Sequence, residues 1–443
     1  MHENQTLSVL TLNCWGLYCS KYREARFATI GAHLSDPTHH YDLVGLQEVW
    51  RDEDYQRLCN MTKGTLPYSR HWASGIDGSG LVILSKYPIL ETSIRRFQLN
   101  GDPTGILQGD WFDGKSCVSA VISHPAGEVV LLNTHLHATY DSKITSDRYL
   151  GCRVAQAWEV ASTIRSTLTH NPLVIALGDF NSAPDSLVAK IVKGYGGLTD
   201  AWEQVHPASP ESRSGLTPQE GIDRLGITCD SPLNSYSSSA GWPNHWTGTP
   251  IGERLDYIFY KASAQLCCTD VQVVLQNKLP LPSGTRKGCC GKLKSSEHVS
   301  DHFAVHAQFS IRPPPSSHHL QQQAKKRHLD EQTLEDVESV HFLLSQQLAK
   351  VRSKRVWVIW GLVLFLKLLA IFLLVVGYMQ WLETWMDARW AWILLSIGVA
   401  WLSSWASMFF LYGLVHCSEA ISSYTTLIGE AKTALDSCHA HLH

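Results

Sequence analysis

The chain has 443 residues, of which 44% are hydrophobic and 17% are charged, and its formal net charge is −3. This length can bury one large domain with residues to spare. The near-neutral charge excludes the basic excess that proteins binding duplex nucleic acid usually carry. Twelve scattered cysteines, including the adjacent pairs Cys267, Cys268 and Cys289, Cys290, form no disulfide or zinc pattern, so we expect reduced thiols.

The first ten residues, MHENQTLSVL, predict no cleavable signal peptide, because no basic stretch precedes a long apolar run. Without translocation, the glycosylation sequons at Asn4 and Asn60 are expected to stay unmodified.

Residues 7–311 alternate between strand-like runs and helical patterns. Apolar spacing predicts helices over 23–34 and 152–168. Some strands follow one another directly, as 117–123 and 128–135 do across the turn sequence HPAG. Such neighbours favour mixed α/β layers with antiparallel pairing over a purely parallel sheet. We expect strands in LSVLTLNCW, YDLVGLQEVW, GLVILSKYPI, CVSAVIS, EVVLLNTHLH, LVIALGDF, RLDYIFY and HFAVHAQFSI.

Two segments of this domain, 206–252 and 276–300, are rich in turn residues. Loops of this length in a compact domain are usually functional or disordered. The second one is either a solvated run of charge or a patch drawn to anionic headgroups or phosphate. Its basic residues, set against Glu297 alone, are Lys278, Arg286, Lys287, Lys292 and Lys294.

The composition changes after residue 311, where we end a catalytic domain formed by 1–311. RPPPSSHHLQQQAKKRH reads as a linker, and a partly amphipathic helix follows it within 312–355. The segments 356–378 and 390–415 are each long and apolar enough to span a bilayer, with tryptophans near their ends. The alternative is a buried helical hairpin of a soluble domain. We expect two transmembrane helices within 356–415 and a C-terminal tail over 416–443.

Basic residues set the expected orientation. Lys350, Arg352, Lys354 and Arg355 precede the first span, whereas the connecting loop 379–389 is poor in them. The positive-inside rule then puts the large domain and the tail in the cytosol. We therefore expect a multi-pass membrane protein, in the endoplasmic reticulum or another intracellular membrane.

Polar residues recur at or near the ends of the apolar runs. Any one of them is more often a structural cap than a functional group. Asp179 and Asn181 lie two residues apart, so in an extended chain both side chains would project to one side. The full set contains acids, amides and imidazoles but no cysteine: Asn13, Glu48, His135, Asp179, Asn181, Asp256, Asp301 and His302.

Carboxylate and amide oxygens are hard ligands that suit Mg²⁺ or Mn²⁺ better than Zn²⁺. Two histidines add a general base and a group that can stabilise developing charge. Asp301 cannot orient its neighbour His302 along a strand, because adjacent side chains face opposite ways. Asp256 is the candidate orienting carboxylate. The set is suited to phosphoester hydrolysis.

The ordered set, and above all GDFN and the later SDH, resembles the endonuclease/exonuclease/phosphatase superfamily over residues 7–311. Within it, LNCWG, QEVW, GSGLVILSKYPI, THLHA and RVAQAWE resemble the magnesium-dependent neutral sphingomyelinases, specifically the sphingomyelin phosphodiesterase 2 type with two membrane spans. The resemblance implies a deoxyribonuclease-like, four-layered α/β sandwich. It also implies a magnesium-binding glutamate at Glu48 and a base at His302.

The sequence GDWFDGKS, residues 109–116, matches the nucleotide P-loop pattern. That motif needs a helix immediately after it, and a strand-like run follows here, so we do not expect an ATPase. In the resembling family this stretch lies near the active site. Lys115 is therefore a candidate contact for the substrate phosphate, with an ordinary surface lysine in a hairpin as the alternative.

The polar set together with this resemblance implies a phospholipase C-type enzyme that cleaves sphingomyelin in the bilayer to ceramide and phosphocholine. We expect Mg²⁺, with Mn²⁺ as a substitute, to be held by Glu48 with Asn13 and Asp301 nearby. His302 would be the base, and anionic phospholipid an additional partner. The rival functions are a lysophospholipid phosphodiesterase, an inositol-phosphate phosphatase, an endonuclease and a non-enzymatic membrane scaffold.

Overall fold

A computed structural model describes the chain over 5–76, 78–103, 105, 109–140, 147–171, 173–207, 215–237, 251–282, 295–312, 330–381 and 389–442. It divides into two compact units. One comprises Met1–Val340 with Leu435–His443, and the other comprises His341–Ala434.

The first unit contains two six-stranded sheets. In the first sheet β1 pairs in parallel with β2 and antiparallel with β14. The end of β1, the end of β2 and the start of β14 therefore meet at one edge. The strands in spatial order are β11 (Leu266–Val274), β14 (Ala304–Ile311), β1 (Gln5–Asn13), β2 (Leu43–Gln47), β4 (Val82–Ser85) and β3 (Tyr68–His71).

The second sheet repeats this arrangement. Its strands β7 and β8 are parallel, and β10 runs antiparallel to β8. The ends of β7 and β8 and the start of β10 again lie together. The spatial order is β5 (Ile89–Arg96), β6 (Ser116–His124), β7 (Gly127–His135), β8 (Val174–Asp179), β10 (Asp256–Tyr260) and β9 (Thr199–Asp200).

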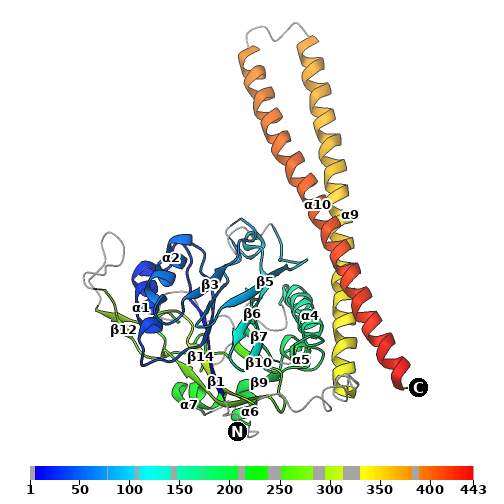
Figure 1. Ribbon diagram of the computed structural model, residues 1–443. Helices are drawn as coiled ribbons and strands as arrows, with labels where there is room; N and C mark the ends of the chain where they lie inside the picture. The colour runs from blue at the N-terminus through cyan, green and yellow to red at the C-terminus, as the bar shows by residue number, and fades with distance from the viewer. Residues whose placement is uncertain are drawn as a thin grey trace. The chain divides into compact units, whose positions relative to one another are not determined.

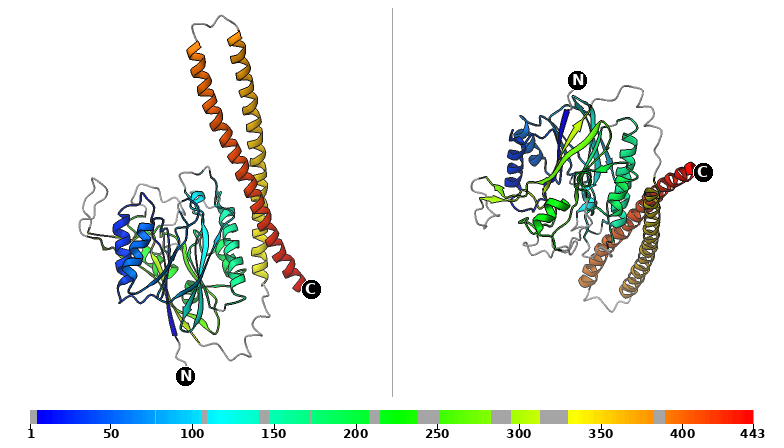
Figure 2. Two further views of the ribbon diagram at one scale, coloured as in Figure 1. Left: turned by 45° about the horizontal axis from the view of Figure 1, so that its top comes forward. Right: turned by 90° about the horizontal axis from the view of Figure 1, so that it is seen from below.

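The two sheets pack face to face between two helical layers (Figures 1 and 2). Val9 and Ile83 of the first sheet share a buried cluster with Leu131 and Ile175 of the second. The helices α1 (Arg23–Ser35) and α2 (Asp52–Thr62) cover the first sheet, and α4 (Leu150–Thr167) and α5 (Leu187–Lys193) cover the second. The predicted four-layered α/β sandwich is confirmed, including mixed parallel and antiparallel pairing.

Short elements complete this unit. They are α3 (Asp110–Asp113), α6 (Ala201–Val205), α7 (Pro218–Leu225), β12 (Leu279–Pro280) and β13 (Ser296–Glu297). The two turn-rich segments thus contain a helix and two short strands. Lys278 lies 3.3 Å from Glu297 and forms an ion pair with it. The rest of the predicted basic patch, Arg286, Lys287, Lys292 and Lys294, lies outside the described residues, as do Cys289 and Cys290.

Two long helices follow, α9 (Glu331–Trp381) and α10 (Arg389–Leu442). Both are long and apolar enough to cross a membrane, and the most apolar stretch of each is unburied. Trp357 and Trp360 are 74% and 62% exposed. The helix α9 continues unbroken through residue 356, where we placed the start of the first span, so the boundaries at 311, 355 and 415 stay predictions.

Candidate active site

The predicted polar residues come together at the edge where both sheets bring strand ends. Asn13 is the last residue of β1, and its register partner Gln47 immediately precedes Glu48. In the second sheet, His135 pairs with Asp179 and Asp179 pairs with Asp256. Asp301 and His302 lie three and two residues before the start of β14. Parallel strand pairs from both sheets therefore deliver this set to one place.

Unusual backbone conformations shape this edge. Glu48 and Asn181 have φ angles of 57° and 47°, in the left-handed region that non-glycine residues rarely adopt. Such strain tends to be kept where function needs it. A Cβ on Gly16 would lie 2.0 Å from the carbonyl oxygen of Glu48, so only glycine allows the chain after β1 to approach Glu48.

Asn13 links two acids of the site. Its Nδ2 donates to Oε1 of Glu48 at 3.1 Å and to Oδ2 of Asp179 at 3.0 Å. The premise that Asn181 continues an extended strand is wrong, because its φ is left-handed. Asn181 still contacts Asp179, but through its backbone N–H at 2.9 Å, while its side chain donates to the carbonyl of Leu136.

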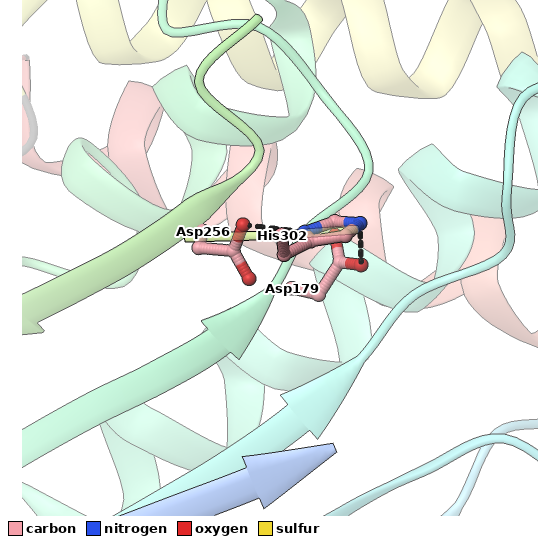
Figure 3. A group of neighbouring side chains, drawn as sticks. All are labelled: Asp179, Asp256 and His302. Atoms are coloured by element: carbon pink, nitrogen blue, oxygen red, sulfur yellow. Dashed lines mark hydrogen bonds and ion pairs between the residues drawn. The ribbon is translucent and has the colours of Figure 1, made fainter. Parts of the chain in front are cut away.

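His302 lies between two aspartates from the opposite sheet (Figure 3). Its Nδ1 lies 2.7 Å from Oδ2 of Asp256, and its Nε2 lies 3.9 Å from Oδ2 of Asp179. Burial lowers the pKa of His302, but Cys229 and Asp256 together raise that pKa well above its usual value. The contact with Asp256 fixes the ring and favours the protonated form of His302.

His135 has a different electrostatic environment. Its Nε2 lies 3.5 Å from Oδ2 of Asp179, and its buried Nδ1 has no hydrogen-bond partner. Burial and the nearby Lys115 lower the pKa of His135 well below its usual value. This histidine is therefore neutral at pH 7, whereas the pKa of His302 is shifted in the opposite direction.

The acids at this edge are hard to ionise in the absence of an ion. Burial, with Asp301 nearby, raises the pKa of Glu48 to about 7. Burial and Asp256 raise the pKa of Asp179 to about 6. Oε2 of Glu48 and Oδ1 of Asp256 are buried without a hydrogen-bond partner. Buried carboxylate oxygens that lack a hydrogen-bond partner are suitable ligands for a hard divalent cation such as Mg²⁺.

Two adjacent groups of residues, joined by the hydrogen bond between Asn13 and Asp179, could hold that cation. Asp179, Asp256 and His302 offer ligand atoms within 4.8 Å of one another. Using all three would put a cation in competition with the 2.7 Å contact of His302 and Asp256. The second group is Glu48 with Asn13, which is hydrogen-bonded to it, and Asp301, whose charge raises its pKa. This group can offer the cation oxygen ligands alone. Because Mg²⁺ prefers oxygen, we favour this second group.

Lys115 is not an ordinary surface lysine. It is 3% exposed, and its Nζ lies 3.0 Å from Oδ1 of Asp110. Burial raises the pKa of Asp110, but Lys115 and His137 hold that pKa well below its usual value. The strand β6 begins directly after Lys115, so the rejection of a nucleotide P-loop is confirmed.

Sequence reasoning missed several supporting residues. Oγ of Ser300 donates to the carbonyl oxygen of Asn13 at 2.6 Å and contacts Oδ1 of Asp301 at 3.2 Å. Nδ2 of Asn234 donates to the carbonyl oxygens of Ser300 and Asp301. Asp110 could have been found from its place in GDWFDGKS, but Asn234 lies in a turn-rich segment with no recognisable pattern.

Comparison with known proteins identifies the family. The model of the endonuclease/exonuclease/phosphatase family matches residues 10–302, which include all eight strand-end residues. The chain belongs to this family. The match runs from within β1 to His302 and includes every strand of the two sheets except β14.

Curated relatives carry sphingolipid names. The chain is 37% identical over 315 residues to the inositol phosphosphingolipids phospholipase C of Schizosaccharomyces pombe, covering 70% of this chain and 69% of the relative. It is 38% identical over 258 residues to human sphingomyelin phosphodiesterase 2, covering 58% of this chain and 56% of that protein. The match thus spans little more than half of the human relative.

Among solved structures, the chain is similar to the sphingomyelinase C of Streptomyces griseocarneus. The sequences are 17% identical, the match covers 70% of this chain and all of that one (100%), and the TM-score is 0.46.

Proposed function

We propose that this protein is a magnesium-dependent phosphodiesterase that cleaves a phosphosphingolipid on the ceramide side of its phosphate, as a phospholipase C does. The observation that carries the reaction type is the buried His302 held by Asp256 beside the oxygen ligands Glu48 and Asp301. The two families of relatives named above support the substrate class, since both act by name on sphingolipid phosphodiesters.

Sphingomyelin is the first candidate substrate, giving ceramide and phosphocholine. Inositol phosphosphingolipids are the second, because the fission yeast relative that carries this name aligns over 70% of the chain at 37% identity. Both substrates present the same phosphodiester and ceramide to the enzyme, so one site can serve either. The two functions differ only in recognition of the headgroup.

In the proposed mechanism Glu48 would hold Mg²⁺, with Asn13 and Asp301 beside it. The bound ion would polarise the phosphate and offset charge that develops on it. His302 takes a proton from the attacking water through Nε2, while Asp256 holds Nδ1 and fixes the ring. His302 must be neutral to act as this base, so we expect turnover to rise with pH over the range in which it loses its proton.

The remaining residues position the reacting groups. Asp179 contacts Asn13 and lies near both histidines, so we propose that it orients the water, with Asn181 supporting it. As a neutral imidazole, His135 would stabilise the pentavalent phosphorus through its N–H, and solvent water would protonate the departing ceramide oxygen. Lys115 is the proposed phosphate contact, since its positive charge lowers the pKa of both Glu48 and His135.

The two apolar helices suit an enzyme whose substrate stays in a bilayer. We propose that α9 and α10 anchor the chain, which keeps the catalytic domain at high local concentration near its lipid. Cytosolic leaflets carry anionic lipid, which attracts nearby basic residues by roughly 1 kcal/mol each.

A lipid panel tests this proposal. Purified full-length protein would be given sphingomyelin, inositol phosphoceramide or lysophosphatidylcholine in mixed micelles, with Mg²⁺ or with a chelator. Headgroup phosphate release from either sphingolipid, only with Mg²⁺, is the expected result. If only lysophosphatidylcholine releases its headgroup, the protein is a lysolipid phosphodiesterase instead. If no lipid releases its headgroup, the proposed function is refuted.

A further inference from the structure

Arg26 on α1 is a fully buried arginine whose donors all point to backbone or hydroxyl oxygens near the candidate site. Its exposed fraction is 0%. Nη1 donates to the carbonyl oxygens of Cys14 at 2.8 Å and Val299 at 2.9 Å. Nη2 donates to the carbonyl oxygen of Trp15 and to Oγ of Ser20, both at 2.8 Å, and Nε donates to the carbonyl oxygen of Lys21 at 2.8 Å.

The guanidinium is also enclosed by aromatic rings. Its central carbon lies 4.8 Å from the ring centroid of Trp15 and 5.8 Å from that of Tyr236. No carboxylate among the described residues lies within ion-pair distance of Arg26. By contrast Arg23, three residues earlier on α1, is ion-paired with the buried Asp54. Burying a charge without an ion-pair partner costs free energy of folding. A buried arginine of this kind is therefore expected to serve a function that offsets this cost.

The oxygens that Arg26 holds lie beside the proposed metal ligands. Cys14 and Trp15 directly follow Asn13, and Val299 comes two residues before Asp301. The segment after β1 also presses on the peptide of Glu48, because a Cβ on Gly16 would lie 2.0 Å from the carbonyl oxygen of Glu48. One planar guanidinium therefore joins the segment after Asn13, which itself packs on Glu48, to the segment before Asp301.

We infer that Arg26 is a positioning residue that sets the spacing of Asn13, Glu48 and Asp301 for a divalent ion. This inference rests on the proposed assignment of those residues as metal ligands. The guanidinium donates to four backbone carbonyls in fixed directions, which a lysine ammonium cannot reproduce. Its charge also offsets the repulsion between Glu48 and Asp301, which act on each other across the ion-free site. Partners that orient metal ligands typically contribute about 10- to 100-fold to metal affinity.

The test compares Arg26→Lys with Arg23→Lys in the full-length protein in detergent. Both variants replace a buried arginine on α1 by lysine, but Arg23 binds Asp54 and contacts none of the strand-end segments held by Arg26. Mn²⁺ affinity would be measured by electron paramagnetic resonance, and unfolding by a thermal scan. We expect Arg26→Lys to weaken Mn²⁺ binding about 10-fold or more, and Arg23→Lys to leave it unchanged at a similar loss of thermal stability.

A milder variant covers the case in which Arg26→Lys does not fold. Ser20→Ala removes one acceptor of Nη2 without touching the proposed ligands, and should weaken Mn²⁺ binding by a measurable but smaller factor. Wild-type Mn²⁺ affinity in each folded variant at Arg26 or Ser20 would overturn the inference. An equal loss in Arg23→Lys would also overturn it, as a general effect of instability. Lipid turnover is measured separately. If Mn²⁺ binding depends on Arg26 but the protein releases no headgroup, only the proposed function is refuted.

Discussion

His302 and Asp256 join the two sheets through a 2.7 Å contact between Nδ1 and Oδ2. Asp256 begins β10 in the second sheet, and His302 precedes β14 in the first. The ring of His302 is therefore fixed by a residue that is distant both in sequence and in sheet order. Its Nε2 is left facing Asp179.

We expect His302→Ala and Glu48→Ala each to reduce turnover by a factor of about 10² or more, because they remove the proposed base and metal ligand. Asp256→Asn should also lose most activity, since it keeps the shape but removes the charge that holds His302. The measurement is headgroup release at saturating Mg²⁺, with the thermal midpoint as a check on folding.

His306→Ala is the matched control for His302. His306 lies on β14, which His302 precedes, and is partly buried, but it contacts Ser8 at 2.8 Å, away from the strand-end set. Near wild-type turnover is expected for this control. Activity within a few-fold of wild type in Glu48→Ala or His302→Ala would overturn the site assignment.

Stabilisation of the protein by Mg²⁺ should increase with pH. In the folded, ion-free protein the pKa of Glu48 is raised from 4.5 to about 7, and that of Asp179 from 3.8 to about 6. The folded state therefore binds more protons than the unfolded state across this range, and the ion-free protein loses stability as pH rises through it. A cation needs the ionised acids, so it restores stability mainly above pH 7.

The measurement is the shift in thermal midpoint on adding Mg²⁺ at pH 5.5 and at pH 7.5. We expect a larger shift at the higher pH in the wild type and a much reduced pH dependence in Glu48→Gln. The exposed Glu53, on α2, supplies the control variant Glu53→Gln, which should behave as wild type. Equal shifts at both pH values would contradict the placement of the ion at Glu48.

Activity should require Mg²⁺ or Mn²⁺ and be weak with Ca²⁺. Calcium takes more oxygen ligands at longer distances than Glu48 with its neighbours can offer, whereas magnesium keeps several waters. Headgroup release would be compared with each ion at concentrations that give matched occupancy. Equal rates with calcium would show that the coordination sphere has been misassigned.

We predict that the catalytic domain and the C-terminal tail lie on the cytosolic side of the membrane, because the basic cluster Lys350–Arg355 precedes the first span. Protease added to sealed microsomes should remove an epitope tag at either terminus. A lumenal reporter tag in the connecting loop, at 382–388, should survive until detergent is added. Protection of the N-terminal tag would reverse the orientation and make the sequons at Asn4 and Asn60 available for glycosylation.

The alternation of strands and helices and the polar residues after apolar runs were sufficient to predict the layered fold and all eight members of the strand-end set. This was possible because the end of a strand is a local feature of the sequence. An apolar run that stops, as the run before Gly178 does, can be recognised from a few neighbouring residues. The two apolar helices were equally visible, since their length and composition are local as well.

Only the tertiary structure decided how these residues work together. Asn181 turns into a left-handed conformation that no strand pattern predicts, so its backbone and not its side chain meets Asp179. Arg26 reaches Val299 across 273 positions of sequence, and Asn234 reaches Ser300 across 66. Such contacts depend on which sheets and loops pack together, and packing is a property of the whole chain that no short pattern contains.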